Sequence, residues 1–161
     1  MSVSVQEADF DVGAEIAALS AGRPEVGAVA SFVGLVRDSG HGKAVQAMTL
    51  EHYPGMTEAS LAEIVAQAGQ RWRLLGVRVI HRYGRLLPCD RIVFVGVASA
   101  HRGDAFAACE FIMDYLKTRA PFWKREETPE GAHWVDARES DDEAAARWGD
   151  EESWDAIDQR R

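Results

Sequence analysis

Short apolar runs, separated by turn-forming residues, dominate the first hundred positions of the chain. Runs of small and β-branched residues, often alternating with polar ones, are typical of buried or half-buried strands. The predicted strands are Ser2–Val5, Val26–Val33, Val45–His52, Gly76–Arg82 and Arg91–Ala98. Between the second and third, Asp38–Lys43 is rich in turn formers and predicts a mobile loop.

Two longer segments show the three-to-four-residue spacing of an amphipathic helix. The first follows Thr57, a predicted N-cap, and its apolar face consists of Leu61, Ile64, Val65, Ala68 and Trp72. The second starts near Asp104 and ends before Pro121, because proline disfavours the helical conformation in the preceding residue. Its predicted apolar stripe is Phe106, Cys109, Met113 and Leu116. A shorter helix is predicted after Asp11.

The alternation returns after the second long helix. Phe122–Glu127 and His133–Arg138 predict a hairpin, and Ser140 with Glu143 predicts a capping box that opens a short helix. Two crossover helices and a late hairpin indicate an α+β fold rather than a doubly wound sheet.

A single domain is expected from the length of 161 residues, 47% of them apolar and 27% charged. We assign it to residues 1–148 and expect 149–161 to form an acidic, loosely held tail. No apolar run is long enough to span a bilayer, and Met1–Phe10 has no basic residue and does not resemble a signal peptide. The cytoplasm is therefore the expected location.

The two cysteines, Cys89 and Cys109, have neither a C-x-x-C pattern nor a histidine cluster around them. A disulfide framework or a zinc site is therefore not expected. Cys109 lies in a helical apolar pattern, which favours a small buried hydrophobic residue over a nucleophile.

Charge is unevenly distributed. The net charge of −8 argues against nonspecific nucleic-acid binding, which requires lysine and arginine to neutralise phosphates. Within this acidic chain, residues 101–125 carry a net charge of +2, whereas residues 126–161 carry −9. The basic segment suggests a local anion site, although a solvated patch of mixed charge would explain the count equally well.

Lysine is scarce, with 3 lysines against 15 arginines. Two of them, Lys117 and Lys124, lie on either side of Pro121. A lysine ammonium can change its pKa with its surroundings, so such a pair can transfer protons or stabilise charge near neutral pH. The alternative for Lys117 is a cation that only stabilises the C-terminal end of a helix dipole.

Further candidates surround this pair. His101 and Arg102 precede the second long helix, where free N–H groups favour an anion. A straight helix would hold them about 24 Å from Lys117, so one pocket needs the return past Pro121 or a second subunit. Arg37 follows a strand in which Gly34 would let a ligand approach the backbone, although an ordinary exposed arginine fits as well.

Alternation in the predicted hairpin sorts its side chains between two faces. One face holds Phe122, Lys124 and Glu126, and the other holds Trp123, Arg125 and Glu127. A carboxylate near Lys124 could orient it, but an exposed cross-strand ion pair would have the same sequence. The residues alone therefore suggest an anion pocket with one or two tunable lysines, and no particular reaction.

Four segments resemble the large, catalytic subunit of molybdopterin synthase. They are Leu50–Met56, Ser99–Arg102, Tyr115–Glu126 and Trp134–Arg138. The likeness extends from about Val26 to Trp148, and the segment with both lysines is its most specific part. Differences lie in the Asp38–Lys43 loop and after Gly149.

The resemblance implies an α/β-hammerhead fold and a sulfurtransferase. The enzyme would be a homodimer at the core of a heterotetramer, in which each copy binds a small ubiquitin-like sulfur carrier. The carrier's Gly-Gly tail, as a thiocarboxylate, would sulfurate cyclic pyranopterin monophosphate twice to form the dithiolene of molybdopterin. No cofactor or metal is implied, because a protein delivers the sulfur.

The resemblance also assigns roles to residues. Lys117 and Lys124 become the catalytic pair. The residues implied to bind substrate are Leu35, Val36, Arg37, His101, Arg102, Lys117, Lys124, Arg125, Glu126 and Arg138. Arg138 resembles an arginine that this family reaches across the dimer. Two rivals, a non-catalytic anion-binding module and a phosphoester-processing enzyme, fit less well, because both lysines are present and no metal site or activated nucleophile stands out.

Overall fold

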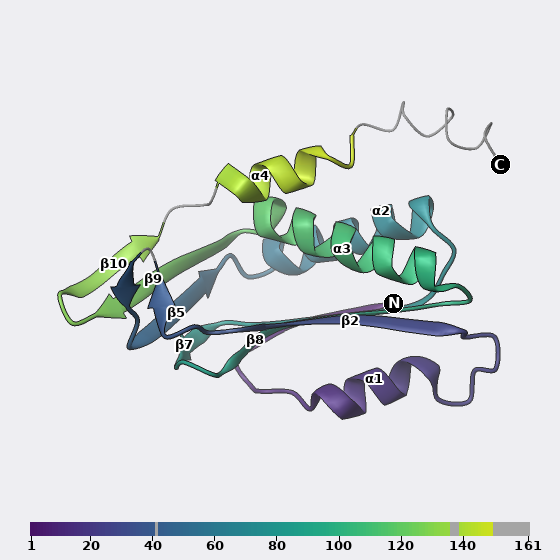
Figure 1. Ribbon diagram of the computed structural model, residues 1–161, viewed down its shortest axis with the longest axis horizontal. Helices are drawn as coiled ribbons and strands as arrows, with labels where there is room; N and C mark the ends of the chain where they lie inside the picture. The colour runs from purple at the N-terminus through teal and green to yellow at the C-terminus, as the bar shows by residue number, and fades with distance from the viewer. Residues whose placement is uncertain (41, 136–138, 150–161) are drawn as a thin grey trace.

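Two four-stranded sheets and four helices make up most of the protein (Figure 1). The computed structural model describes residues 1–40, 42–135 and 139–149. In chain order the elements are β1 (Ser2–Gln6), α1 (Val12–Ser20), β2 (Ala28–Leu35), β3 (Ser39–Gly40), β4 (Lys43–Ala44), β5 (Ala47–His52), α2 (Met56–Arg71), β6 (Leu74–Arg82), β7 (Gly84–Leu86), β8 (Arg91–Ser99), α3 (Arg102–Arg119), β9 (Phe122–Thr128), β10 (Gly131–Val135) and α4 (Glu139–Ala146).

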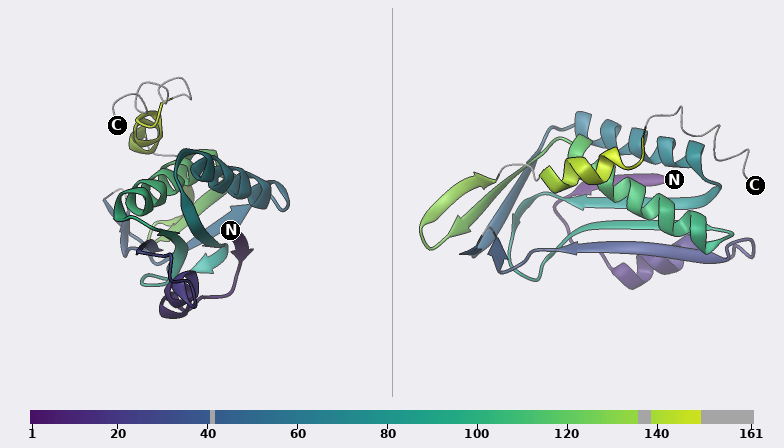
Figure 2. Two further views of the ribbon diagram at one scale, coloured as in Figure 1. Left: turned by 90° about the vertical axis from the view of Figure 1, so that its right-hand side faces the viewer. Right: turned by 45° about the horizontal axis from the view of Figure 1, so that its top comes forward.

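The first sheet has the order β1-β6-β8-β2, with β1 parallel to β6 and the other pairs antiparallel. Helices α2 and α3 cover one face and α1 covers the other (Figures 1 and 2). Because both faces are covered, its central strands are apolar on both sides. The larger core lies under α2 and α3 and includes Leu61, Ile64, Val79, Val95, Phe111 and Ile112.

The second sheet has the order β10-β9-β5-β7 and is antiparallel throughout. A small core of Val36, Met48, Leu50 and Leu86 packs against it. Strand β9 follows α3 after only Ala120 and Pro121, so the chain passes from the helix layer of the first sheet directly into the second. This junction positions the candidate site.

The α+β architecture predicted from the sequence is confirmed, as are the main strands, the helices and the late hairpin. Asp11 caps α1 as expected, since its carboxylate accepts a hydrogen bond of 2.9 Å from the Ala14 N–H. Cys109 is 7% exposed, as the small buried residue predicted. Burial raises the pKa of its thiol to about 11, with a smaller contribution from Glu110.

Several local predictions are wrong. Thr57 is not the N-cap of α2, because Gly55 occupies that position and donates its N–H to the Glu58 carboxylate at 2.7 Å. In the predicted stripe of α3, Phe106 is 66% exposed, whereas Cys109, Met113 and Leu116 are buried as predicted, together with Phe111 and Tyr115.

Other departures concern short elements. The Asp38–Lys43 segment contributes to the small β3–β4 hairpin, and β7 is absent from the predicted strands. Ser140 lies inside α4, which begins one residue earlier, so it is not the N-cap. Arg138 and the tail beyond Gly149 lie outside the described residues, and the division into a 1–148 domain and a tail stays a prediction.

Candidate functional site

A cavity of about 410 Å³ lies where the C-terminal end of α3 meets the second sheet. Its volume is within the range of small-molecule sites in proteins. The polar residues that line it include Arg37, Ser39, His81, Lys117, Lys124, Glu126 and Asp141. Apolar side chains that include Leu35, Val36, Met48, Leu50, Leu116 and Phe122 form the rest of the wall.

Lys117 and Lys124 line this one cavity from the two sides of the junction between α3 and β9. Helix α3 ends at Arg119, and Ala120 is extended, as expected for a residue that precedes proline. The Phe122 N–H then donates to the Ala120 carbonyl at 2.9 Å, which tightens the turn into β9. The segment past Pro121 therefore places Lys124 in the same cavity as Lys117, but it does not bring His101 and Arg102 there.

Strand β9 sorts its side chains as the alternation predicts. Phe122, Lys124 and Glu126 line the cavity, whereas Trp123 is 49% exposed on the other face. Because β9 pairs with β5 on one side and β10 on the other, its register is fixed, with Lys124 opposite Leu50 and Val135. The backbone, and not a flexible loop, therefore holds Lys124.

Glu126 is 6% exposed, and one carboxylate oxygen, Oε2, is fully buried without a hydrogen-bond partner in the described part of the chain. Leaving a buried acceptor unpaired costs about 1–3 kcal/mol. A β-carbon at Gly40 would lie 3.0 Å from both carboxylate oxygens, so glycine at this position leaves room for the side chain. A buried, incompletely paired carboxylate in a cavity wall is suited to accept N–H donors from a ligand.

Leu35, Val36 and Arg37 reach the cavity from the end of β2. Val36 is held on both sides, because its N–H donates to the Asp90 carbonyl and its own carbonyl accepts from Cys89, each at 2.9 Å. Arg37 is therefore exposed on a fixed backbone beside the cavity. The suggestion that Gly34 admits a ligand is wrong, since a β-carbon there would lie 2.7 Å from Val93 and the space is already filled.

The remaining candidates do not gather at this cavity. His101 and Arg102 are exposed at the opposite end of α3 and are not among its lining residues. Arg125 points away from it, with its guanidinium carbon 6.0 Å from the ring centroid of Trp134 on β10. Its Nε is buried without a hydrogen-bond partner in the described residues. Arg138 lies outside the described residues.

The sequence analysis missed three polar lining residues, Ser39, Asp141 and His81, of which only His81 is buried. It lies at the end of β6, is 5% exposed, and stacks on Phe122 with 3.7 Å between ring centroids. Burial lowers the pKa of His81 to about 4, with smaller contributions in the same direction from Lys117 and His52, while the hydrogen bond to the Arg82 carbonyl acts in the opposite direction. A signal was available, because alternation along β6 places His81 on the same buried face as Val77 and Val79.

Two further searches of the described residues gave negative results. No group of three or more histidine, cysteine or acidic side chains is arranged to hold a metal ion. None of the helices described combines the length and apolarity needed to cross a bilayer.

Fold and cavity together define an α+β protein with a cavity that a helix end and an adjoining strand both line with lysine. Comparison with known families is consistent with this class. The model of the family described as MoaE protein matches residues 5–119, and the chain belongs to this family.

Curated relatives share most of its length. A molybdopterin synthase catalytic subunit from Ralstonia nicotianae is 67% identical over 148 residues, which cover 92% of this chain and 84% of the relative. The protein of the same name from Escherichia coli is 65% identical over 139 residues, 86% of this chain and 92% of the relative.

Solved structures agree. A molybdopterin biosynthesis MoaE protein from Burkholderia ambifaria is 59% identical, with a TM-score of 0.80 over 93% of this chain and 99% of that one. The molybdopterin synthase from Staphylococcus aureus is 28% identical, with a TM-score of 0.77 over 83% of this chain and 96% of that one.

Proposed function

We propose that this chain is the catalytic subunit of molybdopterin synthase, a sulfurtransferase of molybdenum cofactor biosynthesis. The observation that carries the proposal is that Lys117 and Lys124 line one cavity in a member of the MoaE family. The substrate is cyclic pyranopterin monophosphate, and the product is the dithiolene of molybdopterin. The cytoplasm remains the predicted location.

The sulfur comes from a small ubiquitin-like carrier whose Gly-Gly tail ends in a thiocarboxylate. A Helicobacter pylori neighbour was solved as a complex of subunits 1 and 2 of molybdopterin-converting factor, although at 20% identity it supports only the fold. Two copies of this chain form the core of the assembly, and each binds one carrier. No cofactor is required, because the carrier delivers the sulfur.

The chemistry consists of two substitutions at carbon. In each round the carrier's sulfur forms a C–S bond to the pterin side chain, and a C–O bond of the substrate breaks, so no electrons are gained or lost. Water then cleaves the acyl–sulfur bond, which leaves the sulfur on the pterin and a carboxylate on the carrier. The departing oxygen needs a proton, and the hydrolysis passes through an oxyanion.

Lys117 is suited to both requirements, since an ammonium can stabilise the oxyanion and donate a proton. Lys124 and Arg37 line the same cavity and supply positive charge for the phosphate. Glu126 supplies an acceptor for N–H groups of the pterin, and Leu35 and Val36 form the wall beside it. His101, Arg102 and Arg138 are assigned to the cavity of the second copy, and Arg125 supports the hairpin next to it.

Lys117→Ala tests the proposal. With purified thiocarboxylated carrier and the cyclic pterin, we expect molybdopterin formation to fall by about 100-fold or more, because a charge that stabilises the transition state is lost. Binding of the carrier, measured by calorimetry, should persist. Lys43→Ala is the matched control, since the ammonium of Lys43 lies on the surface, 3.0 Å from a Glu130 carboxylate oxygen.

A near-normal yield of molybdopterin from the Lys117 variant would refute the catalytic role. A wild-type protein that forms no molybdopterin with a competent carrier would refute the function itself.

A further inference from the structure

His81 is a buried histidine in the cavity wall to which no role has been given above. Apolar side chains would fill its place on β6 at lower cost, because a buried imidazole must have its polar atoms satisfied. Its ring nevertheless lies in the same wall as Lys117, Lys124 and Glu126.

The tautomer of His81 is determined by its surroundings. Its Nδ1 lies 2.8 Å from the Arg82 carbonyl oxygen, and a carbonyl can only accept, so Nδ1 carries the hydrogen. With a pKa of about 4 the ring is neutral at physiological pH and has a single N–H. Nε2 therefore presents a lone pair and can only accept.

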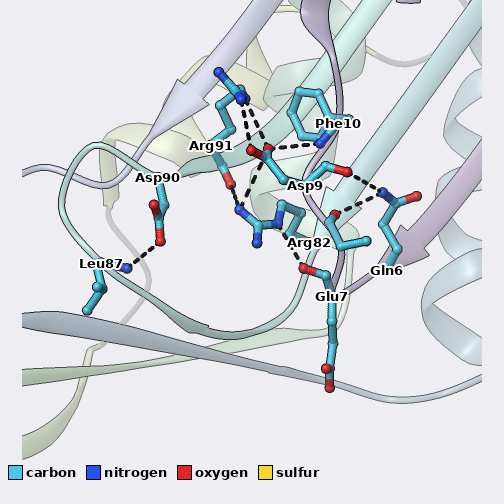
Figure 3. Close-up of polar contacts among 9 residues, drawn as sticks. Gln6, Glu7, Asp9, Phe10, Arg82, Leu87, Asp90 and Arg91 are labelled. Atoms are coloured by element: carbon cyan, nitrogen blue, oxygen red, sulfur yellow. Dashed lines mark hydrogen bonds and ion pairs between the residues drawn. The ribbon is translucent and has the colours of Figure 1, made fainter.

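The Arg82 backbone is itself held in place. The Arg82 guanidinium donates to the carbonyls of Glu7 and Arg91, each at 2.9 Å (Figure 3). Asp9 lies 3.8 Å from the same guanidinium and accepts two shorter hydrogen bonds from Arg91, which hold the pKa of Asp9 below its usual value. The segment before α1 thus fixes the carbonyl to which His81 donates.

Phe122 fixes the plane of the ring. The two rings stack at an interplanar angle of 19°, and Phe122 begins the strand that carries Lys124. One ring nitrogen is used by Arg82, one ring face is covered by Phe122, and the described residues donate no hydrogen bond to the other nitrogen. Nε2 is the polar atom that His81 can offer to the cavity.

Titratable groups face His81 from two further elements. Lys117, at the end of α3, and His52, at the end of β5, both act on it electrostatically. Lys117 lines the same cavity, and an ammonium can donate a hydrogen bond to a neutral imidazole nitrogen. Lys117 is long and exposed, and without such a partner its ammonium would sample many rotamers.

We infer that His81 is a positioning residue, whose unoccupied Nε2 accepts a hydrogen bond from the Lys117 ammonium when that exposed side chain turns into the cavity, and so directs it toward the transferring thiocarboxylate. This inference rests on the proposed function. His81 makes no contact with the reacting atoms in this role. It acts by fixing the direction of the lysine that does, and it stays neutral so that it does not repel that lysine.

Three substitutions of His81 distinguish the effect of its hydrogen-bond acceptor from the effect of its packing. His81→Phe keeps the stacked ring but has no acceptor, and His81→Asn can keep the bond to the Arg82 carbonyl but does not reach the position of Nε2. His81→Gln can place an amide oxygen near that position. His133→Gln, on the exposed strand β10, is the control for a histidine outside the cavity.

Single-turnover sulfur transfer should slow about 10- to 100-fold in the Phe and Asn variants, as expected for a misdirected catalytic group, with KM for the pterin within about twofold of wild type. The Gln variant should recover most of the rate, and the control should match wild type. In nitrogen-15 NMR of the wild type, His81 should show an unprotonated Nε2 whose shift changes in Lys117→Ala.

Folded Phe and Asn variants that transfer sulfur at the wild-type rate would overturn the inference while leaving the proposed function intact. So would an Nε2 shift that does not respond to Lys117→Ala. If the Phe variant does not fold, the comparison of the Asn and Gln variants and the NMR measurement still test the inferred role of His81. A wild-type protein without activity would count against the proposed function, and the NMR result would then stand alone.

Discussion

Both ends of α3 carry basic side chains, but only those at the C-terminal end lie in a cavity. At the C-terminal end the chain passes through Ala120 and Pro121 directly into β9, which leads away from the helix, and Lys117 and Lys124 share a cavity (Figure 1). At the N-terminal end (the open end) His101 and Arg102 are exposed, and the His101 side chain does not cap the helix. A direct junction of helix and strand can build a site within one copy, whereas side chains at an exposed helix end can belong to a site only if another chain completes it.

The largest expected effect tests whether the open end serves the cavity of a second copy. Lys117→Ala and Arg102→Ala should each lower turnover by about 100-fold or more. After subunit exchange between the two variants, activity should recover to about a quarter of wild type, because half of the dimers then contain one intact site of two.

Lys117→Ala mixed with Lys124→Ala is the control, since both residues belong to the same cavity and no dimer regains an intact site. If exchange is verified and the Lys117 and Arg102 pair does not recover, the two ends of α3 do not contribute to one site.

A medium-sized effect is expected from the titration of His81, which is buried in the cavity wall at the C-terminal end of α3 (the closed end). Its folded pKa of about 4 lies below the ordinary histidine pKa of 6.5, so below pH 6.5 the unfolded chain binds a proton that the folded protein does not. Stability is therefore complete above pH 6.5 and is lost as the pH falls toward 4. The loss from pH 7 to pH 5 should be about 2 kcal/mol.

Urea unfolding at the two pH values measures this contribution as the difference between wild type and His81→Gln. His101→Gln is the matched control at the open end. A wild type and a His81→Gln protein with the same pH dependence would contradict the buried, neutral state of His81.

The smallest effect is expected from Gly40→Ala, which narrows the closed end. The new β-carbon would lie 3.0 Å from both carboxylate oxygens of Glu126, so this side chain has to move by a few tenths of an ångström. We expect KM for the pterin to rise several-fold and stability to fall by no more than about 1 kcal/mol. Steady-state kinetics and thermal unfolding check the two effects. Unchanged kinetics in a folded variant would remove Glu126 from the binding site.

Much of the closed end could be predicted from the sequence, because its geometry is local. Pro121 marks the end of the helix, and alternation from Phe122 assigns Lys124 and Glu126 to one face. The meeting of these residues with Arg37 depends on contacts between two sheets, which no spacing within one segment reveals. For that reason the sequence could nominate Arg37 but could not place it.

The misses have physical causes of the same kind. Phe106 fits the helical apolar stripe by spacing, yet tertiary packing buries Ala105 and Ala108 in the first turns of α3 and leaves Phe106 exposed. Thr57 is a good N-cap by type, but its hydroxyl donates to the Tyr53 carbonyl at 2.8 Å from inside the helix. His81 was overlooked because a histidine among apolar residues is read as core until its neighbours across the sheets are known.

Because β9 follows α3 directly, the number of residues between the two lysines determines whether Lys124 faces the cavity. A helix tolerates small rotations of a side chain, but a strand presents each residue to one face or the other. If one residue were inserted after Pro121, Trp123 would face the cavity in place of Lys124. If two were inserted, Lys124 would face the cavity again, but two residues further along the strand. Length variation in this segment is therefore tolerable only in even steps.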